Sequence, residues 1–172
     1  EVENGEIVYI ENNELKNIKP FPSKKPKPCV FEYIYFSRPD SILNGKCVYE
    51  YRKNFGKELA NETDIDADLV VPVPDSGNAA AIGYSQHVGK NFDLGLIRNH
   101  YVGRTFIEPV QKIRSLGVKL KLNANKSSIK DKKIILIDDS LVRGTTCHKI
   151  VKMLYDAGAK EIHVRIASPE IR

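Results

Sequence analysis

Lys133-Ile134-Ile135-Leu136-Ile137-Asp138-Asp139-Ser140-Leu141-Val142-Arg143-Gly144-Thr145-Thr146 is the stretch that decides the predicted fold. Its four consecutive branched apolar residues predict a strand that is buried on both faces, as in the middle of a parallel sheet. A helical pattern follows, in which Thr145 or Thr146 can cap the first turn and Gly158 ends the last one. A second apolar run, 162–167, comes next, so the unit is strand–loop–helix–strand with a right-handed crossover. The sequence therefore predicts an α/β fold, with a mostly parallel sheet flanked by helices.

The loop between that strand and that helix predicts a site for an anion. Backbone N–H groups from Ser140 to Thr146 lie at a helix N-terminus, where unpaired donors and the helix dipole favour phosphate. Gly144 lets the backbone approach a ligand closely, and the hydroxyl groups of Ser140, Thr145 and Thr146 add donors.

The two carboxylates in front of this loop need a different target. Asp138 and Asp139 can accept hydrogen bonds from the vicinal hydroxyls of a sugar, and they can hold a hard cation such as Mg²⁺. A phosphate, a diol and a divalent metal together describe an activated ribose phosphate. The simpler alternative is an Asp pair that only caps the next helix. We favour the ligand because Gly144 and two threonines follow within a few residues.

A similar strand–loop–helix pattern occurs earlier in the chain. Residues 69–74 predict the first strand of the main sheet, and 79–88 predict a helix that ends at Gly89. The tight loop 75–78 between them can present N–H groups to an anion, although Asp75 and Asn78 in that loop could also merely cap the helix. Residues 92–97 predict a further strand. From Arg98 to about Asp131 the periodicity is weak, which usually indicates a functional lid or disorder.

Several motifs resemble those of a known family. The segment 135–146 resembles the phosphoribosyl-pyrophosphate (PRPP) signature of type I phosphoribosyltransferases. Three further motifs, in the right order, resemble glutamine PRPP amidotransferases, also called amidophosphoribosyltransferases, and the similarity runs nearly without gaps from about Cys29 to Arg172. These motifs are Phe31-Glu32-Tyr33-Ile34-Tyr35-Phe36-Ser37-Arg38-Pro39-Asp40-Ser41, Tyr101-Val102-Gly103-Arg104-Thr105-Phe106-Ile107 and Lys121-Leu122-Asn123-Ala124-Asn125.

The resemblance implies the type I phosphoribosyltransferase fold and a set of site residues. In the family, the loop that matches 75–78 binds pyrophosphate, and the irregular segment closes over PRPP as a lid. The chain has His100 where many members carry Arg, which departs from the pattern at one phosphate contact. The implied PRPP-binding residues are Asp75, Ser76, Gly77, Asp138, Asp139, Ser140, Val142, Arg143, Gly144, Thr145 and Thr146. The implied Mg²⁺ ligands are Ser76, Asp138 and Asp139, and the implied catalytic residues of the lid are Tyr101, Arg104 and Lys121.

The N-terminal part predicts a different organisation. Residues 1–18 carry two turn signals around an apolar run and predict a hairpin, which the resemblance interprets as a β remnant of a missing N-terminal glutaminase domain. Residues 19–28 alternate Pro and Lys and predict a stiff linker, so that 29–172 form the phosphoribosyltransferase domain without its C-terminal part. Cys29 is either a small buried residue or, as in some family members, one ligand of a [4Fe-4S] cluster.

Composition limits the function classes. The 172-residue chain has a net charge of +5 at pH 7, with an excess of Lys and Arg between Arg98 and Lys121 that a substrate with several phosphates explains as well as nucleic acid does. We therefore expect no nucleic-acid partner. No apolar stretch approaches the roughly 20 residues that span a bilayer, so no membrane partner is expected either. Three irregularly spaced cysteines favour a reducing, cytoplasmic compartment.

The predicted activity is transfer of a phosphoribosyl group from PRPP to ammonia, which yields 5-phosphoribosylamine and pyrophosphate. The resemblance implies that the full enzyme takes ammonia from glutamine, starts purine biosynthesis, responds to purine nucleotides as feedback inhibitors, and forms a homo-oligomer, either a dimer or a tetramer. Two alternatives stay open: a non-catalytic regulator that senses PRPP, and a salvage phosphoribosyltransferase that acts on a base.

Overall fold

The computed structural model describes residues 2–22, 24–101 and 121–170. The chain divides into two compact units, Glu1–Val30 and Phe31–Arg172. None of the helices in the described part of the chain combines the length and the apolar character needed to cross a membrane.

The first unit is built on the hairpin that the sequence predicts. Strand β1 (Ile7–Glu11) pairs antiparallel with β2 (Glu14–Ile18), and the turn consists of Asn12 and Asn13, whose φ angles are 52° and 63°. Asn tolerates this left-handed region better than most residues, which explains the turn. All residues of β1 are exposed. The interpretation of this hairpin as a glutaminase remnant stays a prediction.

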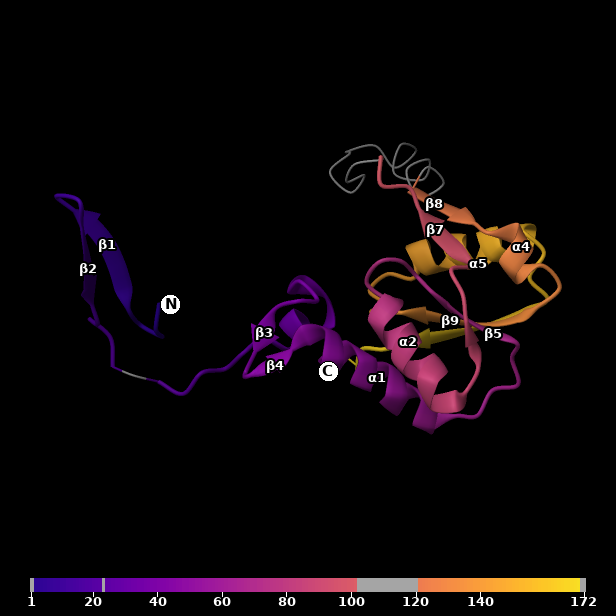
Figure 1. Ribbon diagram of the computed structural model, residues 1–172, viewed down its shortest axis with the longest axis horizontal. Coiled ribbons are helices and arrows are strands. Elements are labelled where there is room, and N and C mark those ends of the chain that lie inside the picture. Colours follow the sequence, from indigo (N-terminus) through magenta and orange to yellow (C-terminus); the bar gives the residue numbers. More distant parts are fainter. Residues whose placement is uncertain (1, 23, 102–120, 171–172) are drawn as a thin grey trace. The chain divides into compact units, whose positions relative to one another are not determined.

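The second unit contains a four-stranded parallel sheet in the order β10-β9-β5-β6, of which Figure 1 labels β9 and β5. Its strands are β5 (Leu69–Pro72), β6 (Asn91–Phe92), β9 (Lys133–Asp138) and β10 (Glu161–Ile166). In β9, the four apolar residues are at most 1% exposed, because β5 and β10 flank the strand and its two faces are covered. The predicted central strand is therefore confirmed.

Helices cover both faces of this sheet (Figure 1). On one face, α1 (Val48–Glu62) and α2 (Asn78–Val88) pack against Ile135 and Ile137 of β9. On the other face, α5 (Thr145–Asp156) and the short α4 (Lys126–Ile129) pack against Ile134 and Leu136. The alternation of side chains along a strand thus divides one apolar run between two cores. Gly89, with φ 67°, ends α2, and Gly158, with φ 101°, follows the end of α5, both as predicted.

The backbones of α1 and α2 touch. A Cβ atom on Gly56 would lie 1.8 Å from the carbonyl oxygen of Ala80, and one on Gly83 would lie 2.0 Å from that of Lys53. Only glycine fits at these two positions, because any Cβ atom there would overlap the backbone of the other helix.

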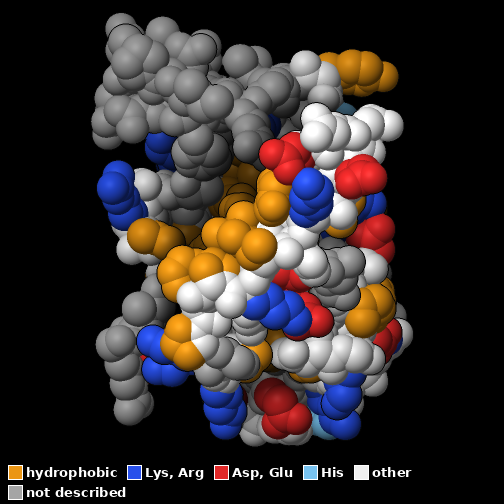
Figure 2. All heavy atoms as spheres, turned by 90° about the vertical axis from the view of Figure 1, so that its left-hand side faces the viewer, with side chains coloured by type: hydrophobic (Ala, Val, Ile, Leu, Met, Phe, Trp, Pro, Cys, Tyr) orange, Lys and Arg blue, Asp and Glu red, His pale blue; other side chains and the backbone are white. Residues whose placement is uncertain are grey.

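A short π-helical segment and a small hairpin precede α1. The segment η1 (Glu32–Phe36) lies within the first family motif, and β3 (Ile42–Leu43) pairs antiparallel with β4 (Lys46–Cys47). Exposed side chains on the face in Figure 2 include hydrophobic groups together with Lys, Arg, Asp and Glu, so charges of both signs occur there side by side.

The prediction of one strand over 92–97 is wrong. The N–H of Asp93 makes the last hydrogen bond to β5, to the carbonyl oxygen of Val70. The chain then turns away from the sheet, because the carboxylate of Asp93 accepts from the N–H of Leu94 and its carbonyl oxygen accepts from the N–H of Gly95. It then forms β7 (Leu96–Arg98), which pairs antiparallel with β8 (Leu122–Ala124) outside the main sheet.

The predicted irregular segment from Arg98 to about Asp131 is also too long. Its described C-terminal part contains β8 and α4, and Leu122 and Ile129 are buried in the core. The polar, weakly periodic sequence concealed them because each is only three or four residues long. Residues 102–120, where most of the predicted lid falls, lie outside the described residues.

Candidate functional site

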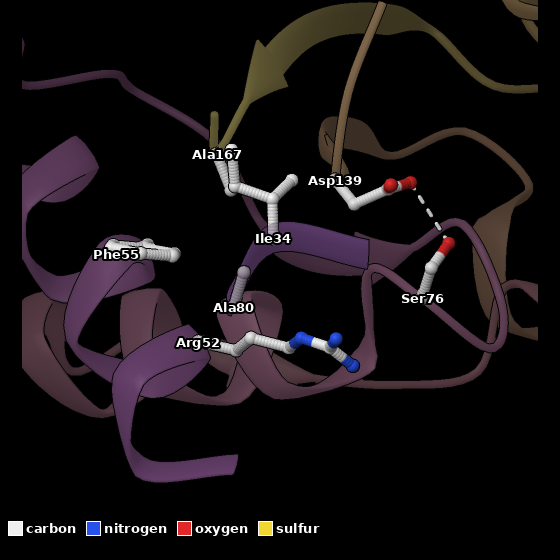
Figure 3. Close-up of a pocket in the computed structure, with 7 residues that line it drawn as sticks. All are labelled: Ile34, Arg52, Phe55, Ser76, Ala80, Asp139 and Ala167. Carbon is white, nitrogen blue, oxygen red and sulfur yellow. Dashed lines mark hydrogen bonds between the residues drawn. The ribbon is translucent and has the colours of Figure 1, made fainter. Parts of the chain in front are cut away.

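Two loops meet at the carboxyl end of the sheet. Because β5 and β9 are parallel neighbours, the loop after each strand emerges at the same edge. Ser76 in the first loop donates a hydrogen bond from Oγ to Asp139 Oδ1 in the second, over 2.9 Å (Figure 3). Ser140 Oγ donates to the other oxygen, Asp139 Oδ2, over 3.0 Å. The structure thus brings together residues that the sequence assigned to the pyrophosphate and ribose-phosphate loops.

Gly77 allows this approach. A Cβ atom there would lie 2.5 Å from the carbonyl oxygen of Ile137 and 2.8 Å from that of Val73. Its N–H already donates to the Val73 carbonyl over 2.9 Å, and the Val73 N–H donates to the Ile137 carbonyl over 2.8 Å. The glycine therefore fixes the first loop against the end of β9, a packing role in addition to the predicted ligand contact.

Asp138 has the most perturbed carboxylate of the site. It ends β9, and its Oδ1 accepts a hydrogen bond from the N–H of Asp139 over 2.9 Å. Burial, together with the side chain and the charge of the neighbouring Asp139, raises the pKa of Asp138 to about 7. A carboxylate that burial disfavours in its ionised form gains from a bound cation or from donated hydroxyl groups. This is the behaviour expected of a residue that binds a diol or a metal.

The loop from Ser140 to Gly144 leads into α5 as the sequence predicts, but the cap differs. The N-cap is Gly144, with φ 70° and no side-chain cap, so the prediction that Thr145 or Thr146 caps the helix is wrong. Both threonines are instead the first helical residues, and their N–H groups belong to the first turn, which has no intrahelical acceptors. Val142 is 79% exposed, and Arg143 is exposed as well.

The helix cap after the first loop also differs from the prediction. The N-cap of α2 is Gly77, and no side chain caps the helix, so neither Asp75 nor Asn78 acts as the side-chain cap considered from sequence. The Asp75 carboxylate pairs instead with the guanidinium of Arg98 in β7.

The structure describes two of the three predicted lid residues. Tyr101 is fully exposed, and Lys121 lies next to β8, where its carbonyl oxygen accepts from the N–H of Asn99 over 2.8 Å. Arg104 lies outside the described residues. The ends of the lid are therefore held side by side, and its catalytic assignments stay predictions.

Arg52 is the residue of the site that sequence analysis missed. It lies on α1, is 5% exposed, and donates from Nε to the carbonyl oxygen of Tyr33 (2.9 Å) and from Nη2 to that of Ser37 (2.8 Å). Burial lowers the pKa of Arg52, and the charge of Asp139 opposes this effect. The sequence feature that could have indicated this residue is an arginine on the helix face that also carries Val48 and Leu59, both of which are buried.

Arg52, Ser76 and Asp139 line one small cavity (Figure 3). Its volume of about 10 Å³ is close to the smallest that holds one water molecule. Four apolar residues complete the wall, namely Ile34, Phe55, Ala80 and Ala167.

The donor atoms fit Mg²⁺ that is shared with a ligand. Within the described residues, no group of three or more His, Cys, Asp or Glu side chains could hold a metal ion. Ser76, Asp138 and Asp139 offer only oxygen atoms, and Mg²⁺ is usually bound by one or two carboxylates plus substrate phosphates. An iron–sulfur cluster needs four thiolates, whereas the chain has three cysteines. Cys29, which is exposed, stays a predicted ligand only.

Comparison with known proteins defines the class first. Residues 40–167 match the phosphoribosyl transferase domain family, and the chain belongs to that family. It is 54% identical to amidophosphoribosyltransferase of Rhizobium etli over 99% of its own length and 36% of the relative's, and 53% identical to amidophosphoribosyltransferase 2, chloroplastic, of Arabidopsis thaliana over 99% of its length and 30% of the relative's. The chain thus spans about a third of these relatives.

A solved structure gives the same result. The glutamine PRPP amidotransferase of B. subtilis, complexed with ADP and GMP, is 49% identical and superimposes with a TM-score of 0.83, covering 99% of this chain and 37% of that one. The resemblance to amidophosphoribosyltransferases and the type I phosphoribosyltransferase fold are therefore confirmed.

Proposed function

We propose that this chain transfers the phosphoribosyl group of PRPP to ammonia, as part of an amidophosphoribosyltransferase that starts purine biosynthesis. The observation that carries the proposal is the hydrogen bond between Ser76 and Asp139, which joins the two loops expected to bind the two ends of PRPP. The names of the relatives support the choice of ammonia over a base.

The residues act mainly by position and electrostatics. Breaking the bond between C1 of the ribose and pyrophosphate builds positive charge on the ring and negative charge on the leaving group. Asp138 and Asp139 accept hydrogen bonds from the ribose hydroxyls, while the N–H groups from Ser140 to Thr146 bind the 5-phosphate. Asp75, Ser76 and Gly77 receive the pyrophosphate. Tyr101, Arg104 and Lys121 help to exclude water, which competes with ammonia for the cation.

Magnesium, when held by Ser76, Asp138 and Asp139 together with the substrate, would neutralise charge on the pyrophosphate. Ammonia has its own lone pair, so the reaction needs no general base from the protein.

Other features of the relatives extend the proposal to the whole protein. Glutamine would supply the ammonia, and purine nucleotides would inhibit by feedback, in line with the ADP and GMP bound to the B. subtilis protein. A homo-oligomer and a cytoplasmic location complete the proposal.

Pyrophosphate release from PRPP tests it, measured on the protein in its natural full-length form with Mg²⁺ and ammonium. Release that depends on ammonium and ignores purine and pyrimidine bases supports the proposal. Release that depends on a base would identify a salvage enzyme instead, and PRPP binding without release would identify a sensor.

A further inference from the structure

The motif Phe31–Ser41 is the part of the sequence pattern that the proposed reaction does not use. None of its side chains hydrogen-bonds to the two ligand loops in the described structure. Its backbone is nevertheless linked to the ligand loops through Arg52, which also lines the cavity beside Ser76 and Asp139. The carbonyl oxygen of Tyr33, within η1, and that of Ser37, directly after it, are the two acceptors of the buried Arg52 guanidinium.

Both of these acceptors are neutral. Among the described residues, no carboxylate forms an ion pair with Arg52. A buried guanidinium is costly unless its charge is compensated, and carbonyl dipoles compensate only part of it. The remainder has to come from a charge at longer range, across material of low dielectric constant.

The cavity identifies that charge. Arg52 and Asp139 line the same small space, and Figure 3 shows the guanidinium directed toward the side on which Ser76 and Asp139 lie. Asp139 is 7% exposed, and its two oxygens are already oriented by the hydroxyls of Ser76 and Ser140. Apolar walls such as Ile34 and Phe55 limit screening by water, so the attraction persists across the cavity.

We propose that Arg52 is a positioning residue for PRPP binding. The carbonyl oxygens of Tyr33 and Ser37 hold its guanidinium in position. The positive charge of the guanidinium in turn holds the Asp139–Ser76 pair in the arrangement that the sugar and the pyrophosphate require. The motif Phe31–Ser41 thereby supports the ligand loops from behind without touching the ligand. This inference rests on the proposed function in that its ligand is PRPP.

Two substitutions in the natural full-length protein test the inference. Arg52→Gln keeps hydrogen-bonding capacity but removes the charge, whereas Arg52→Lys keeps the charge. Lys57→Gln removes an exposed positive charge from the same helix and serves as the control. The dissociation constant for PRPP with Mg²⁺ is measured by calorimetry, kcat and KM by pyrophosphate release, and Tm by thermal unfolding.

We expect Arg52→Gln to raise the dissociation constant and KM by about tenfold with a much smaller change in kcat, and Arg52→Lys to restore the dissociation constant to within about threefold of the wild type. Lys57→Gln should change neither. A purely structural role would lower Tm in both Arg52 variants and leave the affinity of the folded protein unchanged.

An unchanged dissociation constant in folded Arg52→Gln overturns the inference, as does an equal rise in both variants. Should Arg52→Gln not fold, Arg52→Met replaces it as the neutral variant: a rise of about tenfold in its dissociation constant, with Arg52→Lys within about threefold of the wild type, supports the inference, and an unchanged constant overturns it. A wild type that binds PRPP without releasing pyrophosphate refutes the proposed reaction alone. A wild type that binds no PRPP refutes both.

Discussion

Replacing Asp138 by Asn should make the ligand-free protein more stable, by an amount that grows with pH. Burial and the neighbouring Asp139 raise the pKa of Asp138 from the ordinary 3.8 to about 7. Between these two values the folded protein keeps a proton that the unfolded chain has lost. Its stability therefore falls as pH rises from about 4 to about 7, and the cost is complete above that range.

The size of the effect follows from the shift. About three pKa units correspond to at most about 4 kcal/mol, since each unit is worth about 1.4 kcal/mol. Asn carries no titrating proton, and its side-chain oxygen can still accept the hydrogen bond from the N–H of Asp139. The advantage of the variant should therefore grow by about 2 to 3 kcal/mol between pH 5 and pH 8.

Urea unfolding in the presence of a chelator, at pH 5, 6, 7 and 8, measures this difference. Asp156→Asn removes an exposed carboxylate elsewhere in the chain, so it separates the effect of burial from the loss of one negative charge. A stability difference between wild type and Asp138→Asn that stays constant across this pH range would refute the reasoning, because the raised pKa would then have no thermodynamic consequence.

Three further predictions concern the site and its support. Asp139→Asn should lower PRPP affinity or turnover by at least about tenfold, because it weakens a carboxylate that two hydroxyls orient, and steady-state kinetics measures it. Gly56→Ala should lower the free energy of unfolding by about 2 kcal/mol or more in urea titrations, since its Cβ would lie 1.8 Å from the Ala80 carbonyl oxygen; the exposed Asn54→Ala on the same helix should be neutral or slightly stabilising. Removal of Mg²⁺ by a chelator should abolish pyrophosphate release, and added Mg²⁺ should restore it; release that persists would exclude the magnesium assignment.

The parts of the fold that the sequence predicted are those in which one local pattern dominates. The apolar run 134–137 predicted a strand buried on both faces, and Gly89 and Gly158 predicted helix ends, where both glycines have positive φ. The two ligand loops were found because each follows such a strand. Parallel pairing of β5 with β9 then brings Ser76 to Asp139, 63 residues further along.

The missed features depend on tertiary contacts. The break between β6 and β7 is set by hydrogen bonds of Asp93 and by Gly95, where a Cβ would lie 2.7 Å from a side-chain carbon of Ile129. The hydrophobic periodicity of the sequence does not indicate such a contact. The partners of Arg52 are backbone carbonyls of a π-helical segment, and a sequence does not show which carbonyls a buried guanidinium will reach.

The glycine contacts between α1 and α2 have a mechanical consequence. With the two main chains in direct contact, neither helix has room to slide or tilt unless the other moves as well. One of them carries Arg52, and the other begins two residues after Ser76. We therefore expect α1 and α2 to move as one rigid body. Conformational changes on substrate binding should then originate in segments outside this pair of helices.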